Sequence, residues 1–212
     1  SKSQSATDRA SASTAGSTVA AGRDITLLAR GAGAASDIAV AGSRLSAGGN
    51  ALLEAEGSIL LRAAQNTYEQ RTKNKSSSAS VGIGVSADSE NGAGVMVSIG
   101  VSGARGHADG RDASWAYSNV SAGNVLALHS GGDTSLIGAA AQADRIMASV
   151  GGGLRIETLQ DVSTYASKQQ SAGVQAKICV YGYCKSSVSG NVAQGRMDSN
   201  FKSASEQAGL KA

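Results

Sequence analysis

The chain has 212 residues and a formal net charge of +3 at pH 7, contains no proline, and has only 3% aromatic residues. Alanine, serine and glycine together make up almost half of it, which excludes a conventional core of bulky side chains. The low net charge and the ordered apolar patterns argue against disorder, the few aromatic and diluted basic residues argue against a nucleic-acid partner, and no apolar run is long enough for a membrane helix.

The N-terminal residues 1–18 have the composition of the return strand of a hairpin whose outgoing strand lies upstream. We therefore interpret the sequence as a piece of a longer array. Residues 19–66 then contain a recurring sequence motif, in which a β-branched or leucine residue precedes Ala-Gly and a short alternating apolar run. The motif begins at Val19, at Leu45 and again at Val120.

The spacing of these strands predicts a solenoid. The interval from Val19 to Leu45 equals the interval from Val120 to Ile146, and shorter strands recur at regular, smaller intervals between them. No helical period separates the strands, so stacked coils are the architecture that buries them. We expect an all-β protein, a parallel β-helix of four or five coils in residues 19–66 and 119–162, whose narrow interior takes small and β-branched side chains.

Between the two sets of coils, residues 67–118 predict a long antiparallel hairpin. Strict alternation places Val85 opposite Val95, Ile83 opposite Val97 and Val81 opposite Ile99, with a turn at residues 88–92. All these branched side chains share one face. Since an isolated two-stranded hairpin is marginally stable, we expect this face to pack along the side of the β-helix.

The second excursion, residues 163–206, repeats this plan, so the long repeating unit is one set of coils followed by one hairpin. Residues 207–212 begin the next coil, and we expect the whole chain to form one solenoid domain. The ends of such a solenoid expose unpaired strands, which predicts end-to-end self-association. The apolar positions of the second hairpin are Val174, Ala176 and Ile178 outbound, and Val188 and Val192 in the return strand.

Cys179 and Cys184, the only cysteines, lie near the tip of this second hairpin. Facing positions of a hairpin come close enough for a disulfide, and we expect one here. A free thiol pair is the alternative; a C-x4-C spacing with no nearby histidine is a poor zinc site. A disulfide would indicate an oxidising, extracytoplasmic location.

Two sets of exposed residues are candidates for surface contacts. Tyr181 and Tyr183 stand between the cysteines, where they either bind a partner or pack around the disulfide. Arg71, Lys73 and Lys75 form a basic run that either engages an anionic saccharide or lipid headgroup, or is a solvated hairpin base.

The sequence predicts no catalytic, cofactor or metal site. His107 begins a polar stretch, 107–112, that we interpret as a turn, and His129 follows a strand without a nucleophile motif. A β-helix enzyme would need carboxylates converging in one groove. Here they are scattered, one to a strand or turn, at Asp24, Asp37, Glu54, Asp133, Asp144 and Glu157.

Seven short segments of the sequence carry a resemblance to a known family. They are Ser-Ala-Gly-Gly-Asn (46–50), Ala-Ala-Gln-Asn-Thr-Tyr-Glu-Gln (63–70), Lys-Ser-Ser-Ser-Ala-Ser-Val-Gly (75–82), Ser-Ala-Gly-Asn (121–124), Ser-Gly-Gly-Asp-Thr (130–134), Leu-Gln-Asp (159–161) and Ser-Lys-Gln-Gln-Ser (167–171). They resemble the filamentous-haemagglutinin-type repeats of large two-partner-secretion exoproteins, most closely the second haemagglutinin-repeat region of CdiA-type contact-dependent growth inhibition proteins. The resemblance covers nearly the whole chain, although the Cys179/Cys184 tip departs from the Gly/Ser-rich tips of that class.

The resemblance implies a right-handed β-helix on the outside of a Gram-negative cell, secreted through a partner outer-membrane transporter (type V secretion). It also implies a non-catalytic segment that serves as a stalk and in delivering a toxin across the target-cell outer membrane, with that membrane or a surface receptor as partner. The alternative is the shaft of a filamentous haemagglutinin-type adhesin that binds host glycan or protein.

Overall fold

The computed structural model describes residues 1–88 and 92–212, and its contacts divide the chain into two compact units. The coil unit comprises residues 11–68, 112–163 and 201–212, and the hairpin unit comprises residues 1–10, 69–111 and 164–200. The hairpins thus form a compact unit of their own. Within the described residues, no helix is long and apolar enough to cross a membrane.

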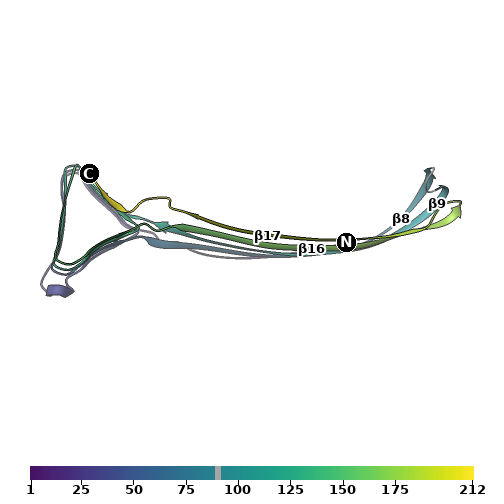
Figure 1. Ribbon diagram of the computed structural model, residues 1–212, viewed down its shortest axis with the longest axis horizontal. Helices are drawn as coiled ribbons and strands as arrows, with labels where there is room; N and C mark the ends of the chain where they lie inside the picture. Colours follow the sequence, from purple (N-terminus) through teal and green to yellow (C-terminus); the bar gives the residue numbers. More distant parts are fainter. Residues whose placement is uncertain (89–91) are drawn as a thin grey trace. The chain divides into compact units, whose positions relative to one another are not determined.

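The coil unit is a parallel β-helix whose three sheets form the sides of a triangle (Figure 1). Four complete coils each give one strand to every sheet, and a fifth coil begins, which confirms the expected number. Their strands are β2 (Thr18–Ala21), β3 (Ile25–Ala29) and β4 (Ile38–Ala41); β5 (Arg44–Ala47), β6 (Ala51–Ala55) and β7 (Ile59–Arg62); β10 (Ser118–Ala122), β11 (Val125–Ser130) and β12 (Thr134–Ile137); β13 (Ala139–Gln142), β14 (Arg145–Val150) and β15 (Leu154–Glu157); and β18 (Gly209–Lys211).

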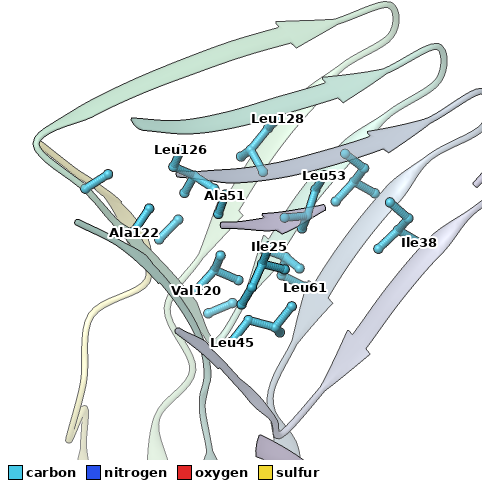
Figure 2. Close-up of a cluster of buried hydrophobic side chains, with 14 of the residues drawn as sticks. Ile25, Ile38, Leu45, Ala51, Leu53, Leu61, Val120, Ala122, Leu126 and Leu128 are labelled. Carbon is cyan, nitrogen blue, oxygen red and sulfur yellow. The ribbon is translucent and has the colours of Figure 1, made fainter. Parts of the chain in front are cut away.

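Equivalent side chains of successive coils stack in register and fill the interior (Figure 2). Every second residue points inward, so strands such as β6 and β10 alternate between buried and half-buried positions. Leu53, Leu61 and Leu126 have no exposed surface. The few interior hydroxyls pair locally: the oxygens of Ser130 and Thr134 lie 2.8 Å apart, and Ser118 donates to the carbonyl oxygen of Arg62 at 2.6 Å.

The interval between equivalent strands that was predicted for both sets of coils is correct for the first coil only. Val19 pairs with Leu45, as predicted, but Val120 pairs with Ala141, which comes earlier in the chain than the predicted Ile146; Ile146 instead pairs with Leu126. The first coil is longer because its second corner carries the short 3-10 turn η1 (Gly33–Ala35). The shorter coil is therefore the basic turn of this helix.

One corner of each coil differs between the coils that continue the helix and those that lead into a hairpin. The residue after β4 is Gly42 and the residue after β12 is Gly138; both have left-handed φ angles, 54° and 61°, and the chain turns directly into the next coil. The pairing registers place Ala63 and Thr158 at the same corner in the other two coils. Side chains disfavour the left-handed conformation, and after both residues the chain runs into a hairpin strand.

The hairpin unit is built on a five-stranded sheet in the order β1-β8-β9-β16-β17, whose long strands run side by side in Figure 1. The oxygens of Ser78 and Ser102 lie 2.7 Å apart, and Ser98 donates to the carbonyl oxygen of Gly82 at 3.3 Å, contacts that fit the predicted pairing of Val81 with Ile99. The predicted turn lies mostly in residues 89–91, outside the described residues. The strands are β1 (Lys2–Ala12), β8 (Ala64–Asp88), β9 (Gly92–Ala116), β16 (Asp161–Gly182) and β17 (Ser187–Ser203).

The apolar face predicted for the first hairpin carries exposed side chains: Val81, Ile83 and Val85 keep 76%, 79% and 81% of their surface exposed. Strand β9 pairs with β16, which joins the two hairpins edge to edge. A sheet of five strands gains from lateral hydrogen bonds the stability that a lone hairpin would need from a covering layer.

The corner glycines generate a first prediction. A Cβ added at Gly138 would lie 2.7 Å from the Cβ of Ala63 and 2.8 Å from the Cδ1 of Leu159, in addition to straining the left-handed backbone. Gly138→Ala should therefore lower the free energy of unfolding by about 1–3 kcal/mol, measured by urea denaturation followed by circular dichroism. Gly153→Ala is the matched control, since its Cβ would meet nothing nearer than 3.7 Å. Equal stabilities for the two variants would contradict the assigned role of the corner.

Candidate functional site

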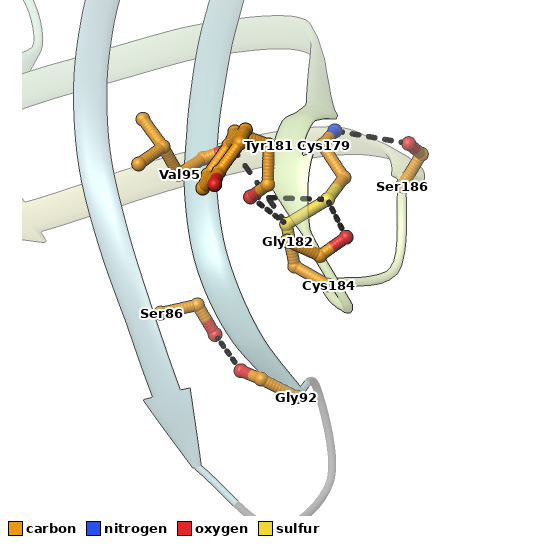
Figure 3. The surroundings of a disulfide bond; sticks show 8 residues. All are labelled: Ser86, Gly92, Val95, Cys179, Tyr181, Gly182, Cys184 and Ser186. Carbon is orange, nitrogen blue, oxygen red and sulfur yellow. Dashed lines mark hydrogen bonds between the residues drawn. A yellow bond between two sulfur atoms is a disulfide. The ribbon is translucent and has the colours of Figure 1, made fainter.

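The tip of the second hairpin is closed by a disulfide between Cys179 and Cys184, whose Cα atoms are 5.5 Å apart (Figure 3). This confirms the pairing expected from the spacing. Around the bridge, the amide of Cys179 donates to the Ser186 hydroxyl at 3.0 Å and the amide of Tyr183 donates to the carbonyl oxygen of Ala93 at 2.8 Å. The second bond joins the tip to the start of β9, so the loop has a defined position on the first hairpin.

The two tyrosines of the tip project from this loop. Tyr181 is 79% exposed and Tyr183 is 95% exposed. The sequence left open whether these rings bind a partner or pack around the disulfide. Their exposure leaves both rings available for a partner, and the bridge restricts the loop that carries them.

The structure separates the three members of the basic run on β8. Arg71 lies 3.8 Å from Glu69, which is also 3.6 Å from Arg111, and it lines a hollow together with Asp109 and Asp198. Acidic neighbours therefore offset its charge. Lys73 and Lys75 lie further along the same strand, in a hollow whose described lining has no acidic residue.

Further basic residues, which the sequence analysis missed, lie beside these two lysines. Arg105 and His107 come from β9 and Lys168 comes from β16, and all three line one hollow with Lys73 and Lys75. The predicted hairpin register already placed Arg105 opposite Lys75, so that neighbour could have been found from the sequence. Lys168 could not, because it depends on how the two hairpins pair.

The coil carboxylates bind backbone groups at the corners of the helix. The carboxylate of Asp24 accepts from the amide of Asn50 at 2.6 Å, that of Asp37 from Ser58 at 2.6 Å, and that of Asp133 from Gly153 at 2.7 Å. Each bond joins one coil to the next. These aspartates are thus structural parts of the stack.

The remaining polar candidates lie at or near the surface. Glu54 and Glu157 are half-buried and pair with Arg30, at 2.5 Å, and with Arg155, respectively. Asp144 and His129 are exposed. His107 lies within strand β9, so the turn predicted for 107–112 is wrong: the hairpin strand continues through it, because β9 pairs there with β16. Among the residues described, no group of three or more His, Cys, Asp or Glu could hold a metal ion.

Residues 1–172 match the family model described as hemagglutinin repeat. The chain is 39% identical over 194 residues to the deoxyribonuclease CdiA of Dickeya dadantii (strain 3937), and 38% identical over 214 residues to the tRNA nuclease CdiA of Escherichia coli (strain STEC_O31). These alignments cover 92% and 99% of this chain but 6% of each relative. The deoxyribonuclease CdiA of Yersinia pseudotuberculosis serotype O:3 (strain YPIII) is 31% identical, with 92% of this chain and 18% of that protein covered. No solved structure matches the chain.

The disulfide generates a second prediction. The bridge closes a very short loop, so its stabilisation of the fold should be modest, about 2 kcal/mol or less. Cys179→Ser/Cys184→Ser should therefore lower the melting temperature by only a few degrees, measured by circular dichroism. Titration of the denatured, unreduced protein with a thiol reagent should detect no free thiol. Two reactive thiols, or a melting temperature lowered far more than this, would contradict this account.

Proposed function

Since the chain belongs to the hemagglutinin repeat family, we propose that it is a β-helical segment of a contact-dependent growth inhibition exoprotein that acts in delivering a toxin domain across the target-cell outer membrane. The toxin domain lies elsewhere in the exoprotein. The protein is exported by a partner outer-membrane transporter and displayed on the surface of a Gram-negative cell. The observation that carries this proposal is the match of nearly the whole chain to a small part of several CdiA nucleases.

The contacts that the carboxylates make among the described residues support a non-catalytic role within such a protein. The coil carboxylates are used in corner hydrogen bonds and surface ion pairs. The chain matches a repeat family and not a nuclease domain. A repeat segment needs no cluster of catalytic carboxylates, which accounts for the scattered acids noted in the sequence. A stalk needs only the stacked coils.

The hairpin unit supports the second part of the proposal, a role in delivery. It contains strands of 22 and 25 residues with exposed apolar side chains. These strands are much longer than a connection between two coils requires. Exposed apolar surface of this extent marks an interaction site in most soluble proteins. We assign the stalk to the coil unit and the contacts made during delivery to the hairpin unit.

The glycines that follow β4 and β12 allow a direct test in the full-length exoprotein. Residues 64–117 are deleted with Ala63→Gly, and residues 159–207 are deleted with Thr158→Gly, so that both corners turn into the next coil as Gly42 and Gly138 do. The protein should still be displayed, measured by antibody labelling of intact cells. It should lose most of its growth inhibition, measured by co-culture with target cells.

The control deletes residues 31–35, which shortens the long corner of the first coil and leaves both hairpins in place. It should inhibit growth normally. Full inhibition by the hairpin-free protein would overturn the assignment of delivery to the hairpins. Retained toxin delivery together with loss of adhesion to host cells would favour the alternative, a haemagglutinin-type adhesin.

A further inference from the structure

A hollow of about 760 Å³ lies on the hairpin sheet, between the basic and the apolar stretches of its strands. Three cationic side chains line it, Lys2 from β1, Lys75 from β8 and Arg105 from β9. Among the described residues that line it, none is acidic. Its volume is within the range of sites for small organic ligands.

The cations stand beside one another across the strands. The side-chain oxygen of Asn74 lies next to Gly106, and Ser78 lies opposite Ser102, so Lys75 faces Arg105 across the pair. The same register places Lys73 opposite His107, and a second hollow of about 370 Å³ shares Lys75 and Arg105 with the first. The like charges of Lys75 and Arg105 on facing strands repel each other. A bound anion would offset that repulsion.

The remaining lining suits a sugar. Gln4, Gln170 and Gln194 supply amide groups, which both donate to and accept from hydroxyls. Arg105 donates through Nε to the side-chain oxygen of Gln170 at 3.0 Å, which holds one amide and one cation in place. Gly103 and Ala172 carry little or no side chain, so a ring can approach the backbone of the sheet there.

We propose that this hollow binds an anionic polysaccharide through its phosphate or sulfate groups, with Lys75 and Arg105 as the main anion contacts and the glutamines on the sugar hydroxyls. The site is distinct from the disulfide tip and does not depend on the role in toxin delivery. A lipid surface is the less favoured ligand, because the three amides lining the hollow match a ligand rich in hydroxyl groups, and a sugar ring supplies more of these than a phospholipid headgroup does.

The test measures binding of a sulfated hexasaccharide to the purified 212-residue chain by isothermal titration calorimetry. Lys75→Gln/Arg105→Gln should weaken binding roughly tenfold or more, because two charge-assisted contacts are lost. Ala172→Leu should weaken it as well, since the larger side chain fills the hollow while the net charge is unchanged. Lys75 and Ala172 are exposed in the strands that carry them, so circular dichroism should show an unaltered fold.

Lys177→Gln/Lys185→Gln is the matched control: it removes the same charge from exposed positions outside the hollow and should leave affinity within about twofold. Equal losses in both double variants would show attraction by net charge alone and overturn the site. Binding to phosphatidylglycerol vesicles without binding to the free saccharide would overturn it in favour of a lipid surface. Failure of the wild-type chain to bind the hexasaccharide, or a normal affinity of Ala172→Leu, would also overturn it.

Discussion

The structure depends on the in-register stacking of short strands from successive coils. The coil strands of the β-helix are too short to bury their own apolar side chains. Stacking joins the backbone of every coil to its neighbours and aligns side chains such as Leu53 with Leu128 and Leu61 with Leu136. The interior is narrow because the coils are small, so alanine and single branched residues fill it. Corner bonds from Asp24, Asp37 and Asp133 add a polar connection between coils.

A single corner position then organises the chain above the level of the coil. Glycine in a left-handed conformation turns the chain into the next coil at Gly42 and Gly138, whereas Ala63 and Thr158 precede the long hairpin strands. One turn of the helix can therefore be followed either by another turn or by a long hairpin. Such an arrangement places hairpins at regular intervals without breaking the stack, because the register across each excursion is preserved: Leu45 still pairs with Val120.

The hairpin sheet differs from the coils in having no interior. Its strands gain stability from pairing edge to edge, and many of its side chains remain available to other molecules. The type of exposed side chain therefore changes along the strands. Charges of both signs lie near Arg71 and Asp109, and cations lie near Lys75 and Arg105. Aliphatic residues follow from Val81 onward. A surface divided in this way can contact several kinds of partner, which fits a segment proposed to act between two cells.

The sequence by itself determined the β-helix, the number of coils, the internal register of the first hairpin and the disulfide. Each of these follows from local patterns: alternation along a strand, Ala-Gly corners, facing positions of a hairpin, and two cysteines close together in the chain. Only the tertiary structure decided that Val120 stacks on Ala141, that β9 pairs with β16, and that Lys168 joins Lys73 and Lys75. Those contacts depend on how separate coils and hairpins align with one another, and side-chain alternation along a single strand does not specify its register against a strand distant in sequence.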